Sequence, residues 1–115
     1  MEMCAETIIP TDHFGIRTNF FKTIKAKTIR SYPSGDKLMV LWLWMIALAG
    51  EDGRTDRSLM VDDQIPYTPR FLGIKTDYST DFVEYALNIF LELKMIEIKN
   101  GIIFLMEDDS FLIHA

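Results

Sequence analysis

An Asn-Gly pair between two β-rich runs constrains the fold of this chain more than any other feature. Residues 95–99 and 102–106 are rich in isoleucine and other apolar side chains, and Asn100 and Gly101 separate them. Asn-Gly is the pair that a two-residue type I′ turn favours, because both central residues of that turn take positive φ. The sequence therefore predicts a tight antiparallel β-hairpin over residues 95–106.

A helix is predicted immediately before the hairpin, over residues 80–94. Ser79 or Thr80 can cap its N-terminus, and the carboxylates of Asp81 and Glu84 favour the positive end of the helix dipole. Apolar side chains recur in it with the helical period and predict one buried stripe: Phe82, Val83, Ala86, Leu87, Phe90 and Leu91. The helix should pack on the core through that stripe.

A shorter helix precedes this one. Thr68 is a suitable N-cap and Pro69 a favoured first residue, and about one and a half turns follow before Thr76. Short helix, turn, longer helix and hairpin follow one another as in a winged helix-turn-helix, with residues 58–61 as a third strand pairing with the hairpin. The predicted fold class is therefore α+β, mostly α: a winged helix-turn-helix with a small antiparallel β-hairpin as its wing.

The centre of the core is predicted to be a helix over residues 36–49. Its run of twelve apolar residues is shorter than the roughly 20 that cross a bilayer, so we expect a buried helix and no membrane partner. Asp36 is a plausible N-cap, and Gly50 can end the helix. Trp42 and Trp44 lie about 200° apart on such a helix, so one of them should reach the surface.

The chain should form one domain. Its 115 residues and hydrophobic fraction of 49% suffice for a single core, and no repeat or low-complexity segment interrupts it. We expect an N-terminal arm over residues 1–19, the winged-helix domain over 20–106, and an acidic and apolar C-terminal end over 107–115. The domain should open with a short amphipathic helix over residues 20–30, whose lysines form a basic face.

Charge is distributed unevenly along the chain. The whole sequence carries 12 Lys and Arg against 17 Asp and Glu, a net charge of −5. Residues 76–115 hold two Lys and Arg against eight Asp and Glu, a net charge of −6, whereas residues 17–37 hold six cations and one acid. Most cations of a nucleic-acid surface would therefore come from the first part of the chain, because Lys and Arg neutralise phosphates.

Three segments of the sequence resemble a known family. They are IKAKTIRSYPSGDKLMVLWLWMIALAG, LMVDDQIPYTPRFLGI and ALNIFLELKMIEIKNGII, which together extend over roughly residues 20–106. In order and spacing they resemble the N-terminal domain of phage replisome organiser proteins. The resemblance implies a winged-helix domain that binds the duplex DNA of the phage origin, associates with itself and assembles the replisome at the initiation of phage DNA replication.

The resemblance also implies partners and a location. Such proteins join this domain to a C-terminal part that recruits host helicase-loading proteins, and we expect that part to be missing here because the chain ends soon after the hairpin. A phage or prophage would encode the chain, which would act in the cytoplasm of the bacterial host. The N-terminus lacks the basic segment of a secretory signal, in agreement with that location.

Thirteen side chains are candidates for contact with DNA. Ten are cations that can neutralise phosphates, and three are polar side chains that can form hydrogen bonds. They are Lys22, Lys25, Lys27, Arg30, Lys37, Arg54, Arg57, Arg70, Lys75, Lys99, Ser79, Thr80 and Asn88. A solvated basic face is the alternative interpretation of the cations, and Lys99 is equally compatible with a turn that only closes the hairpin.

A second class of function stays open. The outward face of the helix before the hairpin is expected to present Asp81, Glu84, Tyr85, Asn88 and Glu92. Carboxylates repel phosphates, so this face favours an acidic winged-helix module that binds protein, by dimerising or by occupying the basic cleft of a DNA-binding protein. The acids at 107–109 fit such a binding strip or a simple solvated edge.

Catalytic chemistry is not predicted. His13 and His114 lie near the two ends, Cys4 is the only cysteine, and neither a metal-ligand spacing nor a glycine-rich phosphate loop occurs. Adjacent acids such as Asp62 and Asp63 do not converge on an identifiable site. We therefore expect no enzyme activity, no metal and no cofactor.

Overall fold

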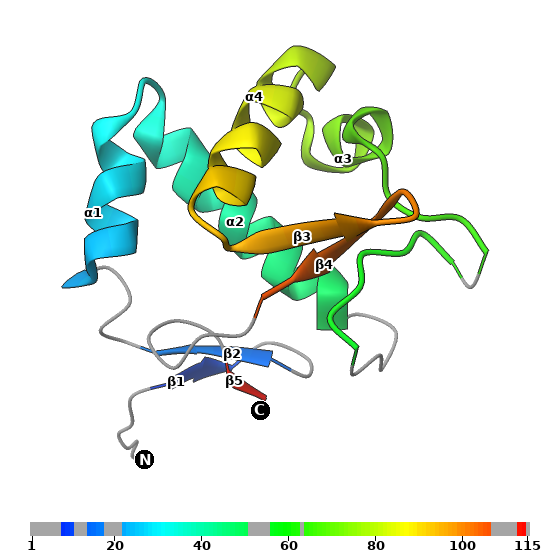
Figure 1. The fold of residues 1–115 in the computed structure, drawn as a ribbon, viewed down its shortest axis with the longest axis horizontal. Coiled ribbons are helices and arrows are strands. Elements are labelled where there is room, and N and C mark those ends of the chain that lie inside the picture. The colour runs from blue at the N-terminus through cyan, green and yellow to red at the C-terminus, as the bar shows by residue number, and fades with distance from the viewer. Residues whose placement is uncertain are drawn as a thin grey trace.

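The computed structural model describes residues 8–10, 14–17, 22–50, 56–62, 64–106 and 113–114. Within these residues, four helices pack with a β-hairpin, and a small sheet lies below them (Figure 1). The elements are β1 (Ile8–Pro10), β2 (Phe14–Arg17), α1 (Ile24–Ser31), α2 (Gly35–Gly50), α3 (Pro69–Thr76), α4 (Thr80–Glu92), β3 (Ile96–Lys99), β4 (Ile102–Leu105) and β5 (Ile113–His114). The predicted fold class, an α+β winged-helix-like domain with more helix than strand, is confirmed.

Helix α2 runs through the centre of the core, as its apolar composition predicts. Trp42 and Phe90 of α4 are both fully buried, and their ring centroids lie 5.3 Å apart in a tilted contact. Trp44 is 37% exposed, which confirms that only one of the two tryptophans enters the core. No helix in the described part of the chain is long and apolar enough to cross a membrane.

The start of α2 differs from the prediction. The helix begins at Gly35, and the N–H of Leu38 donates to the carbonyl oxygen of Ser34 at 3.0 Å. Asp36 therefore lies inside the first turn, and its predicted role as N-cap was wrong because the corner after α1 brings the chain into the helix one residue earlier. At the other end, Gly50 is the last residue of the helix.

Gly35 permits the close approach of α1 and α2 at that corner. A Cβ atom at this position would lie 2.6 Å from the backbone oxygen of Arg30, well inside van der Waals contact. We expect Gly35→Ala to lower the free energy of unfolding by about 1–3 kcal/mol, because the backbone must shift to admit the methyl group. Urea denaturation measures this free energy. The control is Lys27→Ala at an exposed position of α1, which should change the free energy of unfolding by less than about 0.5 kcal/mol. An unchanged midpoint in Gly35→Ala would contradict the close approach.

Helix α1 begins later than predicted. The hydroxyl oxygen of Thr23 accepts a hydrogen bond from the N–H of Ala26 at 3.2 Å, so Thr23 is the N-cap and the helix starts at Ile24. The predicted start at residue 20 was wrong because apolar periodicity does not mark a helix boundary, whereas a capping side chain does. Ala26 and Ile29 are its buried residues, and α1 packs against α2.

The predicted caps of the helix-turn-helix are confirmed. The hydroxyl oxygen of Thr68 accepts from the N–H of Phe71 at 3.2 Å, and Pro69 is the first residue of α3. The hydroxyl oxygen of Ser79 accepts from the N–H of Phe82 at 3.1 Å and caps α4, so Ser79 and not its neighbour is the N-cap. Helices α3 and α4 then pack against each other.

The buried stripe of α4 is only partly as predicted. Five of its residues are buried: Val83, Ala86, Leu87, Ile89 and Phe90. Phe82 is half-buried and Leu91 is exposed, so the predicted burial of Leu91 was wrong. Ile89 and Leu91 lie about 100° to either side of Phe90 on the helix, and tertiary packing alone decides which of these two edges is covered.

The hairpin has the predicted pairing and turn. Strands β3 and β4 are antiparallel, and Lys99 lies opposite Ile102 next to the turn. Asn100 and Gly101 have φ angles of 54° and 78°. These are the positive angles that a type I′ turn requires, so the Asn-Gly pair is the local cause of the hairpin.

The predicted third strand is shorter than expected. Ser58 forms an isolated antiparallel bridge with Phe104 of β4, so this segment does pair with the hairpin. Beyond it the chain turns back on itself, and the N–H of Val61 donates to the carbonyl oxygen of Ile65 at 2.7 Å. The predicted strand over residues 58–61 was therefore too long.

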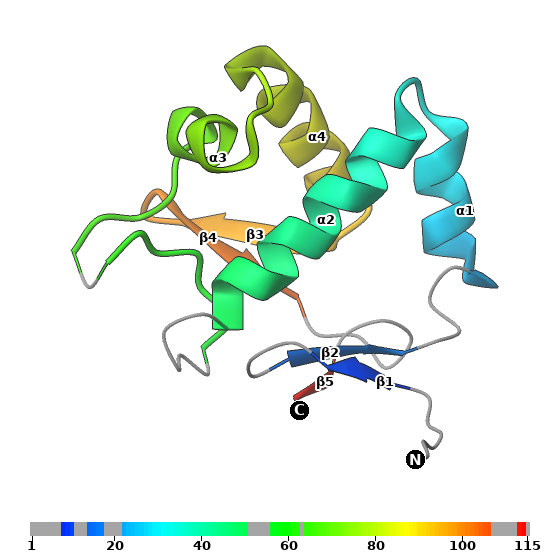
Figure 2. The same cartoon turned by 180° about the vertical axis from the view of Figure 1, so that it is seen from behind.

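A second sheet brings together segments from both ends of the chain. Its strand order is β1-β2-β5, all antiparallel, with Ile9 opposite Ile16 and Gly15 opposite Ile113. Figures 1 and 2 show it beneath α2, which β2 contacts. The sequence did not predict these strands: residues 8–17 were expected to belong to an N-terminal arm, and β5 joins β2 from the far end of the chain, which no local pattern indicates.

Candidate nucleic-acid interface

Helix α1 and the residues before it gather four cations. Lys22 precedes the helix, and Lys25, Lys27 and Arg30 lie on it. Lys22, Lys27 and Arg30 are exposed, and Lys25 is half-buried. Helix α1 packs its buried residues against α2, so these cations lie on the part of the helix that faces away from the core. We call the four of them the α1 basic surface.

Lys37 connects the corner between α1 and α2 with the start of α4. Its ammonium lies 4.5 Å from the ring centroid of Phe82 and 5.3 Å from that of Tyr78, within the range of cation–π attraction. The hydroxyl of Tyr85 donates to the carbonyl oxygen of Pro33 at 2.8 Å. Tyr85 was predicted on the outward face of α4. It is instead half-buried, and its hydrogen bond joins that helix to the corner between α1 and α2.

The other exposed cations among the predicted DNA contacts lie toward the other end of the domain. Arg70 and Lys75 are exposed on α3, and Lys99 is exposed next to the hairpin turn. Figures 1 and 2 show α1 at one end of the long axis and α3 with the hairpin turn at the other. The predicted cations therefore form two separate groups instead of one continuous face.

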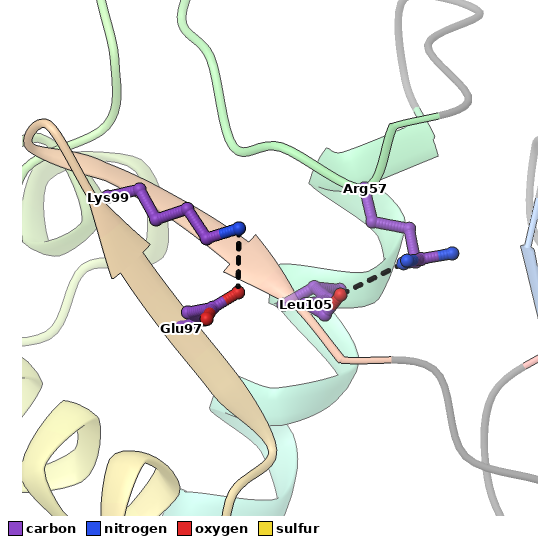
Figure 3. Close-up of polar contacts among 4 residues, drawn as sticks. All are labelled: Arg57, Glu97, Lys99 and Leu105. Atoms are coloured by element: carbon purple, nitrogen blue, oxygen red, sulfur yellow. Dashed lines mark hydrogen bonds and ion pairs between the residues drawn. The ribbon is translucent and has the colours of Figure 1, made fainter.

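Lys99 and Arg57 both have partners in the hairpin (Figure 3). The ammonium of Lys99 lies 3.3 Å from the carboxylate of Glu97 and 5.9 Å from the ring centroid of Phe104. The Nε–H of Arg57 donates to the carbonyl oxygen of Leu105 at 3.0 Å and ties the chain before the bridge to the end of β4. Arg57 therefore helps to hold β4, whereas Lys99 forms an exposed ion pair within β3.

The polar candidates have different surroundings. The hydroxyl oxygen of Ser79 already accepts a hydrogen bond as the N-cap of α4, so the role of this side chain is structural. Thr80 and Asn88 are exposed on α4. Arg54 lies outside the described residues.

A groove runs between α4 and β3. Its first part has a volume of about 300 Å³ and is lined by Pro69, Glu84, Leu87, Asn88, Leu91 and Ile98. Its second part has a volume of about 380 Å³ and is lined by Leu91, Lys94, Ile96, Glu97, Ile98 and Met106. The two parts share Leu91 and Ile98, so they are adjacent, and we call them together the α4–β3 groove.

The floor of this groove is apolar and open to solvent. Leu91 is 38% exposed, Ile98 43% and Met106 36%. This site was not predicted from the sequence, because Leu91 was expected in the core and the hairpin was expected only as a wing. One pattern in the sequence bears on the groove: Ile96 and Ile98 fall on the same face of a strand. The alternation of side chains along a strand does not show where on that face the core ends.

Metal-binding chemistry has little support in the described part of the chain. Within those residues, no three His, Cys, Asp or Glu side chains are grouped so that they could hold a metal ion. Several side chains weighed in the sequence analysis lie outside the described residues: Cys4, His13, Asp63 and the acids at 107–109.

One family of known proteins matches most of the chain. The profile of the N-terminal phage replisome organiser family matches residues 13–113, a span that includes all four described helices and the hairpin. The chain belongs to this family. Curated proteins and solved structures compared with the chain gave no match.

Membership in the N-terminal phage replisome organiser family confirms the resemblance seen in the sequence. It assigns the chain to a family of organisers of phage DNA replication. For such an organiser, the α1 basic surface and the α4–β3 groove are candidate contact surfaces, because both present exposed side chains to solvent.

Proposed function

We propose that this phage replisome organiser domain binds the duplex DNA of the phage origin through the α1 basic surface and thereby initiates phage DNA replication in the cytoplasm of the bacterial host. One observation carries the proposal: residues 20–35 contain four cations and no Asp or Glu. Duplex DNA carries one negative charge per about 1.7 Å of its axis, and cations that neutralise phosphates supply a large share of its affinity for proteins. Exposed Lys37 adds a fifth cation between α1 and the start of α4.

Helix α4 has a secondary part in this proposal. In winged-helix docking the second helix of the pair enters the major groove. Here α4 carries Asp81, Glu84 and Glu92 and no Lys or Arg. Repulsion between these carboxylates and the phosphates opposes deep insertion, so the phosphate contacts are assigned to α1.

A fluorescence-anisotropy titration of the wild-type chain with a labelled phage-origin duplex tests the proposal. At about 50 mM salt we expect saturable binding, and at about 200 mM salt an affinity lower by an order of magnitude or more, because condensed counterions are released from the DNA. A duplex of the same length and scrambled sequence is the control for origin specificity. Failure to bind either duplex at roughly 50 µM protein would overturn the proposal.

Asn88 provides a test of whether α4 reads the bases. If Asn88 formed a bidentate contact with an adenine, its removal would cost about 1–3 kcal/mol of discrimination. Because we assign the contacts to α1, we expect Asn88→Ala to keep the origin-DNA affinity within about twofold of the wild type. The same anisotropy titration measures it, and a loss of about tenfold or more would instead place α4 in the DNA groove.

Self-association and replisome assembly belong to the same proposal. We take residues 20–106 as the winged-helix unit, flanked by the arm at 1–19 and the end at 107–115. Host helicase-loading proteins are proposed partners through the C-terminal part that such organisers carry.

Protein binding by the α4–β3 groove is a second candidate function. The exposed apolar floor of the groove favours it, since exposed apolar side chains that cluster beside a polar rim are typical of protein-binding sites. Size-exclusion chromatography with light scattering, with and without a candidate DNA-binding protein, tests it. A chain that stays monomeric and binds none of the added proteins would count against this function.

A further inference from the structure

We infer that the α4–β3 groove of one copy of the chain receives helix α1 of a second copy. This gives the self-association in the proposed function a defined geometry and rests on that part of the proposal. Because the contact uses the same helix as the proposed DNA contact, any one α1 helix makes one contact or the other.

The groove offers an apolar floor and a mostly acidic surround. Its floor is formed by Leu91, Ile98 and Met106, which the domain's own core does not cover. Glu84 and Glu97 are the carboxylates among its lining residues, Lys94 is the one cation among them, and Glu97 also forms an ion pair with Lys99 at 3.3 Å. Helix α4, which forms one wall, carries three acids and no Lys or Arg. A suitable occupant is therefore apolar at its centre and positively charged around it.

Helix α1 has those properties. Ile24, at its start, is 80% exposed, the highest value for a large apolar side chain in the described chain. Lys27 follows three residues later and so lies on the same side of the helix, and Lys22 precedes it. The cations flank one exposed apolar side chain, which matches a groove that is apolar at its centre.

A second copy of the chain can supply this occupant, because each copy carries both the α4–β3 groove and an exposed helix α1. The exposure of Ile24 shows that the groove of the same molecule does not hold it. Contact between two α1 helices would oppose cations, and contact between two grooves would oppose carboxylates, so like surfaces repel. The favoured contact joins unlike surfaces, head to tail, and such contacts build a ring or an open filament.

Sedimentation velocity of the full chain without DNA tests this contact. We expect the weight-average sedimentation coefficient to rise with protein concentration at low salt and to fall as salt is added, because part of the attraction is between exposed charges. Lys22→Glu with Lys27→Glu should weaken association by at least about fivefold, and so should Glu84→Lys with Glu97→Lys. An equimolar mixture of these two double variants should associate again, since each reversed surface then meets its complement.

Two further variants separate the possible explanations. Arg70→Glu with Lys75→Glu changes the net charge as much as the α1 double variant but lies on α3, and it should still associate. Ile24→Ser removes the apolar anchor without changing charge, and it should weaken association while origin-DNA binding is retained, which distinguishes loss of assembly from loss of DNA binding. A wild-type chain that is monomeric at every concentration, or a mixture of the charge-reversed variants that does not associate, would overturn the inference.

Discussion

Replacing Lys22 and Lys27 together by glutamate is expected to weaken binding to the origin duplex about tenfold or more at low salt. Both side chains are exposed, so their reversal leaves the core intact while it removes two cations from the surface proposed to meet the phosphates. The slope of log affinity against log salt should become shallower by about two, because about one counterion is released for each phosphate contact. Anisotropy titrations at several salt concentrations measure both quantities.

The matched control for this change is Arg70→Glu with Lys75→Glu. These residues are also exposed, and their reversal alters the net charge equally, but α3 lies at the opposite end of the long axis from α1 (Figure 1). We expect a loss of less than about threefold, since charges separated from the contact by more than a Debye length are screened. A loss in this control that equals or exceeds that of the α1 variant would mean that DNA lies against α3 and the hairpin.

Phe90→Ala is expected to lower the free energy of unfolding by about 3–5 kcal/mol. The side chain is fully buried, and its ring lies against Trp42 at the crossing of α2 and α4. The loss combines the transfer energy of the ring with the cavity that it leaves. Because small domains are stable by about 5–15 kcal/mol, this single change should remove a large fraction of the stability.

Urea denaturation of two neighbouring variants provides the control. Leu91→Ala changes an exposed residue and should cost about 1 kcal/mol or less. Ile89→Ala changes a buried residue and should cost about 2–5 kcal/mol. If Leu91→Ala destabilised the domain as much as Phe90→Ala, the stripe predicted from the sequence would be right and the observed orientation of α4 wrong.

The parts of the fold that the sequence predicts are those with a local chemical cause. Asn100 and Gly101 define the hairpin because they tolerate positive φ, and the caps at Thr68 and Ser79 define the helix starts because a side-chain oxygen accepts a specific N–H. Each of these features depends on residues within a few positions of one another. The winged-helix-like order could therefore be predicted without any knowledge of tertiary contacts.

The features that the sequence does not predict depend on tertiary contacts. Ile89 and Leu91 are equivalent in the helical pattern, and only the packing around α4 separates them. The third strand ends early because of a turn at Val61, and β5 pairs with β2 from the far end of the chain. Periodicity carries no information about such contacts.

For the candidate site, the sequence supplies the types of residue but not their grouping. The cations before residue 40 could be recognised as basic, yet only the fold shows that α1 and α3 hold separate groups at opposite ends. Arg57 and Ser79 were candidates for DNA contact, and each proves to hold the fold through a hydrogen bond. The α4–β3 groove was not predicted, because its floor comes from two elements whose exposure depends on where the core ends.

A titration of the isotopically labelled chain with an unlabelled origin duplex, followed by NMR, tests the assignment of DNA binding to α1 most directly. We predict that the backbone amide signals of Lys22 to Arg30 shift progressively and saturate, while those of Glu84, Asn88 and Ile98 shift little. Shifts confined to α4 and the hairpin turn, with α1 unaffected, would contradict that assignment.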